Sequence, residues 1–450
     1  VRDLMALARA AYPDGAGREP LGALARRLGE PVRIAVLGPA ESGVSTLVAA
    51  LVGGEVPRSG PAGPPVPVWF RHGDAARTAM TPEGRLVVLP AVALQRMTLI
   101  DLPTVGAHPG SAAAAALLDA GRTGGPAFDA LVLLLRGEAD ARPLRRVLPA
   151  GRSAHHPGTT VGVLAAVEVS CDGGADPAGA REAAIRLGMS SEVRPLCRTV
   201  VAVSGLLAAA AVTLRQNEFD LLREVATWPA DELDHRVTAP GAFAEGPGGG
   251  DGAGPARRAL LHRFGPLGVR TAAEALRTGV VSGPAGVAGV LLTASGLTRL
   301  QELLTTRVLA RADTLRARSV LIGLEVLVRA APPAGAAGER LLYQVERVRA
   351  GAHELTELDL VDELWTGGSA LGPDERAAAE RLLGADGPQL HLRLGVAADT
   401  APDELRRVAA VQLGRWRERA VHPAASQRTR DVAQVLVRTC ERVLEVATQG

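Results

Sequence analysis

A glycine-rich segment near residue 40 has the spacing of a phosphate-binding loop, apart from one residue. The motif requires Gly-x-x-x-x-Gly-Lys-Ser/Thr, and the chain has Gly38 and Gly43 at the two glycine positions, followed by Val44, Ser45 and Thr46. In such a loop the backbone N–H groups hold phosphate oxygens, and the lysine reaches the β- and γ-phosphates. Val44 stands at the lysine position, so the segment has the frame of a nucleotide site without its cation.

The segments around this loop predict a strand before it and a helix after it. Residues 32–37 (Val-Arg-Ile-Ala-Val-Leu) form an apolar run with β-branched side chains, which indicates a buried strand. Residues 45–51 are rich in alanine, leucine and valine and predict a helix. This order directs N–H groups and the helix dipole at a phosphate. A plain Gly/Ser turn is the alternative, and the order of elements favours the phosphate-binding loop.

A second residue with chemistry is Asp101, at the end of an apolar run that begins at Met97. An acidic residue at the carboxyl end of a strand is the usual water-mediated anchor for magnesium. In this combination the chain resembles the dynamin-like GTPases, especially the bacterial ones, in which such a strand is followed by Asp-x-Pro-Gly. Here Thr104 stands in place of that glycine, whose N–H normally contacts the γ-phosphate.

The resemblance extends over residues 1–330, and three further family positions are altered within it. Ala40 stands where the family has the glutamine that positions the attacking water. Residues 62–65 (Ala-Gly-Pro-Pro) replace the threonine that ligates magnesium, ahead of a strand expected at 66–73. The guanine-recognition motif Asn/Thr-Lys-x-Asp corresponds to Val169-Ser170-Cys171-Asp172, which keeps only the aspartate.

The resemblance therefore implies a nucleotide site that has lost most of its chemistry. The missing lysine removes a charge-assisted contact of roughly 1.5–3 kcal/mol, which weakens phosphate binding by roughly one to two orders of magnitude. We expect GTP, GDP and Mg²⁺ to bind weakly or not at all and hydrolysis to be negligible, unless Arg71 or Arg122 replaces the lysine. The candidate nucleotide-binding residues are Gly38, Ser42, Gly43, Val44, Ser45, Thr46, Asp101 and Asp172, with Ser45 and Asp101 as magnesium ligands and no catalytic residue.

Composition excludes several other functions. The 450 residues carry 50 basic and 48 acidic side chains, and the basic ones are all arginine. This balance argues against a nucleic-acid surface, and 2% aromatic residues argue against stacking on single strands. The three cysteines, Cys171, Cys197 and Cys440, lack metal-site spacing and indicate reduced thiols in the cytoplasm. No signal peptide is predicted, because the opening residues lack a long apolar stretch. No membrane span is predicted either, because the nearest candidate, 279–297, contains Pro284 and five glycines and is typical of a packed helix.

The predicted architecture combines two fold types. Residues 32–212 are expected to form an α/β P-loop GTPase-like domain with a doubly wound, mostly parallel sheet. Two short helices at 1–31 are expected to join an elongated α-helical bundle at 213–330, interrupted by a flexible Gly/Pro-rich loop at 241–255. Apolar residues three or four apart predict one long helix over 297–330 with a solvated arginine-rich face.

The last 120 residues, 331–450, are predicted to be helical. Two helices, at 403–420 and 429–446, flank His422-Pro423-Ala424. This pattern is faintly similar to a J-domain, in which His-Pro-Asp engages an Hsp70 chaperone, although alanine replaces the aspartate. A plain helical hairpin with a proline stop is the favoured alternative.

Three functions remain open from the sequence. The first is a dynamin-like pseudo-GTPase that acts as a structural or regulatory partner of an active homologue, in the cytoplasm or at a membrane surface. The second is an active membrane-remodelling GTPase that uses another cation. The third is an adaptor that binds Hsp70 through the C-terminal helices.

Overall fold

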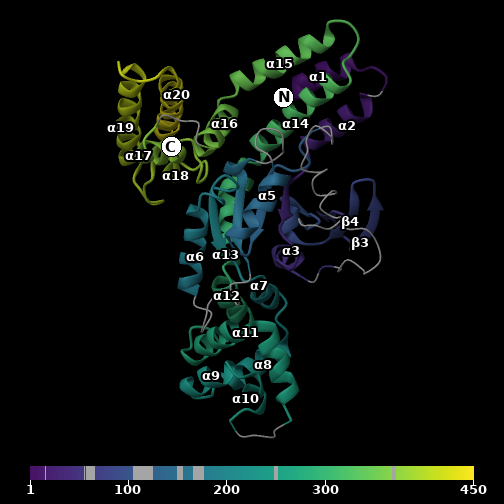
Figure 1. The fold of residues 1–450 in the computed structure, drawn as a ribbon, viewed down its shortest axis with the longest axis vertical. Coiled ribbons are helices and arrows are strands. Elements are labelled where there is room, and N and C mark those ends of the chain that lie inside the picture. The colour runs from purple at the N-terminus through teal and green to yellow at the C-terminus, as the bar shows by residue number, and fades with distance from the viewer. Residues whose placement is uncertain are drawn as a thin grey trace.

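The computed structural model describes residues 1–15, 17–54, 56, 66–104, 125–148, 156–165, 177–247, 252–366 and 371–449. A mostly parallel sheet lies in the middle of the molecule, and helical groups extend from it in opposite directions (Figure 1). The strands that the structure describes are β1 (Val32–Leu37), β2 (Val68–His72), β3 (Arg77–Thr81), β4 (Gly84–Leu89), β5 (Met97–Asp101), β6 (Ala130–Leu135), β7 (Thr160–Leu164) and β8 (Thr199–Ala202).

The strand order is β3-β4-β2-β5-β1-β6-β7-β8. Strands β5, β1, β6, β7 and β8 run parallel, whereas β2 is antiparallel to β5 and β3 is antiparallel to β4. The central strands are apolar and buried on both faces, which is the pattern that the sequence showed at 32–37, 97–101 and 130–135. The register pairs Val36 of β1 with Asp101 of β5, so the acidic strand end lies beside the end of β1.

Helices cover both faces of the sheet, which confirms the doubly wound α/β prediction. On one face α3 (Val44–Val52), α7 (Gly205–Val212) and α13 (Leu297–Leu303) contribute to a single apolar core. On the other face α5 (Ala141–Val147) and α6 (Pro177–Met189) pack on the opposite side chains of the same strands. Short 3₁₀ helices lie at Val92–Gln95, Glu138–Asp140 and Pro157–Thr159.

Below the sheet in Figure 1, helices α7–α12 enclose a core of their own. Their remaining members are α8 (Gln216–Val225), α9 (Ala230–Val237), α10 (Pro240–Glu245), α11 (Gly254–Arg277) and α12 (Pro284–Ala294). The expectation of a flexible loop over 241–255 is wrong at both ends, because α10 and α11 enter it. Phe243 is fully buried in this core and holds α10 in place. Helix α12 begins at Pro284, as predicted, and no described helix is long and apolar enough to cross a bilayer.

Above the sheet, the N-terminal helices pack with a later part of the chain. Helices α1 (Arg2–Ala11), α2 (Arg18–Arg27), α14 (Ala312–Ala330) and α15 (Ala337–Gly351) share one core, called here the N-terminal bundle. The C-terminal unit has a separate core. It comprises α16 (His353–Thr366), α17 (Pro373–Leu382), α18 (Leu390–Leu394), α19 (Pro402–Val421) and α20 (Gln427–Gln449). Helices α19 and α20 pack closely against each other on either side of His422-Pro423. A J-domain-like pair and a plain helical hairpin both require this geometry.

The single long helix expected over 297–330 is broken in its middle. A π-helical segment (Leu304–Val308) and a 3₁₀ turn (Leu309–Arg311) separate α13 from α14. The break turns two arginines toward other elements. Arg307 donates to Thr199 and Asp386 at 2.8 and 2.9 Å, and Arg311 donates to the carbonyl of Leu383 at 2.8 Å. The prediction of a solvated arginine face is therefore wrong for these residues, whereas Arg299 is exposed.

The N-terminal bundle joins the sheet at one buried carboxylate. Asp129, just before β6, lies 2.9 Å from the guanidinium of Arg27 on α2, and both side chains are at most 5% exposed. Asp129 also accepts hydrogen bonds from Ser319 Oγ on α14 at 2.6 Å and from the backbone N–H of Arg33 on β1 at 2.8 Å. Burial lowers the pKa of Arg27 to about 10, so the arginine stays charged and depends on this partner.

We predict that Asp129→Asn lowers the free energy of unfolding by about 3–5 kcal/mol, because it leaves the Arg27 charge buried without a counter-ion. Urea unfolding followed by circular dichroism measures this loss. The double variant Arg27→Met/Asp129→Asn should recover part of it. Asp14→Asn, which breaks the exposed Arg18–Asp14 pair, is the control and should have little effect. Equal losses of unfolding free energy in Asp129→Asn and Asp14→Asn would contradict a stabilising role for the buried pair.

Candidate functional site

The loop between β1 and α3 has the backbone of a phosphate-binding loop. Glu41 and Gly43 have positive φ angles of 63° and 84°. A glutamate in this region is strained, and such strain is concentrated at functional loops. The N-cap residue of α3 is Gly43, which has no side chain to cap the first turn, so among the described residues it leaves the first N–H groups of this helix available as donors. The loop is thus shaped to hold an anion through its backbone.

Glycine is required at the first position of the loop by close packing. A Cβ atom on Gly38 would lie 2.5 Å from Ser42 Oγ and 2.9 Å from the Cβ of Leu134 on β6. Ser42, predicted as a nucleotide-binding residue, is buried and directs its hydroxyl back into the loop. Gly38 and Ser42 therefore shape the loop, and neither supplies a charge.

Val44 belongs to the apolar core beneath the loop. Its side chain is 5% exposed and packs in the cluster formed by β1, α3 and β6. The Cγ2 atom of Val44 lies 3.2 Å from the Cβ position of Gly38, so the side chain runs along the base of the loop. The position that carries the lysine in a complete loop therefore contributes packing and no cation.

Ser45 and Asp101, the predicted magnesium ligands, lie in direct contact. Ser45 Oγ donates to Asp101 Oδ2 at 2.7 Å. Burial raises the pKa of Asp101 to about 6, and the hydrogen bond from Ser45 opposes this shift. A hydroxyl and a carboxylate are the oxygen ligands that Mg²⁺ takes together with water and phosphate. These two groups fit the ion, although among the described residues no group of three or more acidic, histidine or cysteine side chains is placed to hold a metal ion by itself.

Thr46 faces the start of α7. A Cβ atom on Gly205 would lie 3.7 Å from Thr46 Cγ2, and Ser204 caps α7 by accepting from the N–H of Leu207 at 3.2 Å. The loop and the segment after β8 therefore meet. Asp172, Arg122 and the 62–65 segment lie outside the described residues.

Arg71 is not placed to replace the missing lysine. Strand β2 is antiparallel to β5 and pairs Val68 with Asp101, so Arg71 lies farther along β2, away from the loop. Its guanidinium lies 5.7 Å from the ring centre of Trp69 and 4.0 Å from the carboxylate of Glu83. Of the two arginines that the sequence left open as a substitute cation, Arg71 is therefore not placed to serve the loop.

The structure instead brings Arg136 to the loop, a residue that the sequence analysis missed. Leu134 of β6 packs on Gly38, and Arg136 follows two residues later. Side chains two residues apart on an extended chain lie on the same face, so Arg136 lies on the face that meets the loop. The hydrogen bond and charge of Asp140 raise the pKa of Arg136, and the charge of Glu41 in the loop adds to this. The sequence feature that could have identified Arg136 is its position directly after β6, the buried strand next to β1.

The strand order, the loop between β1 and α3 and the helical groups on both sides define a dynamin-like protein with a GTPase-type domain. No family model matches the chain. The chain is 30% identical, over a 464-residue alignment, to the isoniazid-induced protein IniC of two Mycobacterium tuberculosis strains, CDC 1551/Oshkosh and H37Rv. The alignment covers 94% of this chain and 92% of IniC. The chain therefore belongs to the IniC family of bacterial dynamin-like proteins.

Solved structures give a weaker likeness. Two structures described as an oligomerised bacterial dynamin pair, with a mechanism for long-range sensing and tethering of membranes, align at TM-scores of 0.30 and 0.29. Their sequence identities are 9% and 10%, and each alignment covers 96% of this chain and 87% of the other. The family assignment rests on IniC.

We predict that Asp101→Asn makes the protein more stable at neutral pH. The folded state holds the Asp101 proton more tightly than the unfolded chain, so wild type loses stability as the pH rises from about 4 to about 6. Asparagine does not ionise and keeps an acceptor for Ser45. The variant should match wild type at pH 4 and exceed it at pH 7.5 by about 1–3 kcal/mol in urea unfolding. A difference that does not change with pH would contradict this.

Proposed function

We propose that this protein is a dynamin-like pseudo-GTPase that acts as a structural or regulatory partner of an active homologue. The observation that carries the proposal is the burial of Val44 beneath a loop that keeps its phosphate-binding shape. Phosphoryl transfer depends on positioning and charge neutralisation, and the side chain at the lysine position provides neither. The mostly parallel sheet and the loop between β1 and α3 support descent from a GTPase.

Retention of the loop shape supports a role for this face of the domain other than hydrolysis. The strained Glu41, the uncapped first turn of α3 and the exposed Arg136–Asp140 pair lie at the carboxyl edge of the sheet. A face that keeps polar groups without a complete active site suits recognition of a related domain. The resemblance to bacterial dynamin-like proteins, which often act as unequal partners, makes a lysine-bearing homologue the proposed partner.

A second candidate function is GTP binding and turnover with Arg136 as the cation. The observation that favours it is the place of Arg136 two residues after Leu134, which packs on Gly38, together with the favourable charge of Glu41 on Arg136. Its guanidinium is held by Asp140 at 3.1 Å and remains half-exposed, so phosphate would have to compete with that carboxylate. Under this alternative, the wild-type protein binds nucleotide and the Arg136→Gln variant does not. Under the pseudo-GTPase proposal, the substitution leaves nucleotide binding unchanged.

We predict that Val44→Lys increases affinity for GTP and GDP, in the presence of Mg²⁺, by about 10–100-fold. The lysine stem would follow the path of Val44 along Gly38, and its ammonium would supply the missing charge. Titration calorimetry measures the change. Val44→Met, with an unbranched apolar side chain, is the matched control and should bind as wild type does. A Val44→Lys variant that binds no better than Val44→Met would show that the loop has lost more than its lysine.

Pairing is tested by mixing the chain with a lysine-bearing dynamin-like homologue from the same organism. Sedimentation velocity should detect a complex, and the homologue's GTP turnover should change when the chain is added. Arg136→Glu reverses the charge on the loop face and should weaken the complex, whereas Arg407→Glu, on the exposed face of α19, should not. Separate sedimentation with unchanged turnover would count against the proposed partnership.

A further inference from the structure

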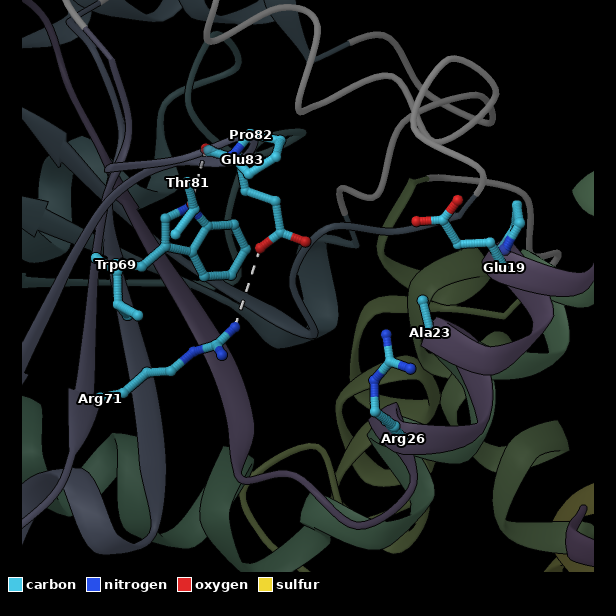
Figure 2. Close-up of a pocket in the computed structure, with 10 residues that line it drawn as sticks. Glu19, Ala23, Arg26, Trp69, Arg71, Thr81, Pro82 and Glu83 are labelled. Atoms are coloured by element: carbon cyan, nitrogen blue, oxygen red, sulfur yellow. Dashed lines mark hydrogen bonds and ion pairs between the residues drawn. The ribbon is translucent and has the colours of Figure 1, made fainter. Parts of the chain in front are cut away.

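A cavity of about 520 Å³ lies between α2 of the N-terminal bundle and the edge of the sheet (Figure 2). Helix α2 contributes Glu19, Ala23 and Arg26 to one wall. Trp69 and Arg71 of β2, and Glu83 in the turn between β3 and β4, form the other wall. The cavity contains no residue of the phosphate-binding loop, so it is independent of the proposed function.

The sheet side of the cavity is fixed by its own contacts. The indole N–H of Trp69 donates to the carbonyl of Glu83 at 3.1 Å, and the Trp69 side chain is almost fully buried. Thr81 Oγ1 donates to the carbonyl of Gly84 at 2.8 Å across the turn. Gly84 has a φ of 130°, and a Cβ atom there would lie 2.3 Å from the carbonyl oxygen of Pro67. This wall is therefore preorganised.

The helix side is fixed as well. Arg27, the neighbour of Arg26, forms the buried pair with Asp129 that holds α2 against the sheet. Glu19 and Arg26 are seven residues apart on α2, so they lie on one helix face with about 10 Å of axial rise between them. Neither side chain makes an ion pair or hydrogen bond with any residue that the structure describes.

The two charges on the helix wall of the cavity lie apart, whereas the two on the sheet wall form a close pair. In Figure 2 the carboxyl groups of Glu19 and Glu83 lie toward the upper end of the gap, and the guanidinium groups of Arg26 and Arg71 lie toward the lower end. The ion pair between Arg71 and Glu83 is loose, with 4.0 Å between the charged groups and side chains that are 35% and 59% exposed. Both of its members can therefore turn to a ligand.

We propose that this cavity binds a small zwitterion whose ammonium and carboxylate groups are separated by a short apolar chain. The carboxylate would be held by Arg26 and the ammonium by Glu19 through charge-assisted hydrogen bonds. Arg71 and Glu83, only 4.0 Å apart, line the opposite wall, and either can turn toward the bound ligand. The chain between them would lie on Ala23 and the side of the cavity that Trp69 forms. A separation of roughly 8–10 Å between the charged groups matches the spacing along α2. Because its walls come from α2 and the sheet, such a ligand would hold the N-terminal bundle against the GTPase-type domain.

A series of ω-amino acids tests the proposal by titration calorimetry on the full chain. 8-Aminooctanoate should bind at least about tenfold more tightly than glycine, whose charges are too close to reach both ends. Hexanoate and hexylammonium, with one charge each, should also bind at least tenfold more weakly. Absence of binding by 8-aminooctanoate at millimolar concentration, or equal binding of all four compounds, would overturn the proposal.

Three variants identify the site. Arg26→Gln and Glu19→Gln should each weaken binding of 8-aminooctanoate about tenfold, because each removes one of the two charged contacts. Arg18→Gln is the matched control on the same helix, since Arg18 is 71% exposed and lies outside the cavity, and it should bind as wild type. Circular dichroism checks that all three variants are folded. Equal affinities for Arg26→Gln and Arg18→Gln would place binding elsewhere and overturn the assignment.

Discussion

The buried carboxylate of Asp129 joins four elements of this molecule. It accepts the charge of Arg27 from α2, the hydroxyl of Ser319 from α14 and the backbone N–H of Arg33 from β1. The start of β6, the start of β1 and two helices of the N-terminal bundle thus meet at one charge with almost no contact with water. A buried charge of this kind is strongly destabilising without its partners, which makes the arrangement of bundle and sheet specific.

The C-terminal unit is attached in the same way and to the same edge of the sheet. Asp362 of α16 contacts His156 Nδ1 at 3.0 Å and the N–H of Gly158 at 2.8 Å, both just before β7, and Arg318 of α14 at 3.1 Å. These partners outweigh burial and hold the pKa of Asp362 down at about 2. Asp386 joins Arg198, just before β8, to Arg307 at 2.6 and 2.9 Å.

All of these junctions lie at the amino ends of the parallel strands. The carboxyl ends, where the phosphate-binding loop and Asp101 lie, are free of them. Ligands of open α/β sheets bind at the carboxyl ends. The fold therefore separates attachment of the N-terminal bundle and the C-terminal unit from the face that would meet a nucleotide or a partner. The α7–α12 group instead joins the carboxyl end of β8, where the backbone N–H of Ser204 donates to the carbonyl of Ser295 at 2.9 Å.

The sequence predicts the parts of this structure that depend on local pattern. Buried parallel strands such as β1 and β6 are continuous apolar runs, and the loop between β1 and α3 follows from two glycines. It does not predict the break between α13 and α14, because the apolar spacing continues through Val308 and the cause is a set of distant partners of Arg307 and Arg311. It likewise predicts a flexible segment around Phe243, where one buried aromatic ring orders a helix.

In the candidate site, too, the sequence predicts what depends on local pattern and misses what depends on distant parts of the chain. The spacing of the loop identified Ser45 and the missing lysine at Val44, and the end of an apolar run identified Asp101, which the fold brings to 2.7 Å from Ser45. The burial of the Val44 side chain, the distance of Arg71 from the loop and the approach of Arg136 all depend on strand register, which the sequence does not encode locally.

The central claim is that this dynamin-like domain keeps the shape of a nucleotide site without its affinity. Equilibrium dialysis of the wild-type chain against labelled GTP and GDP, with Mg²⁺, tests it most directly. The account predicts no saturable binding up to about 1 mM nucleotide, which corresponds to less than about 4 kcal/mol of binding free energy. Saturable binding in the micromolar range would contradict it and would show that another cation performs the task of the missing lysine.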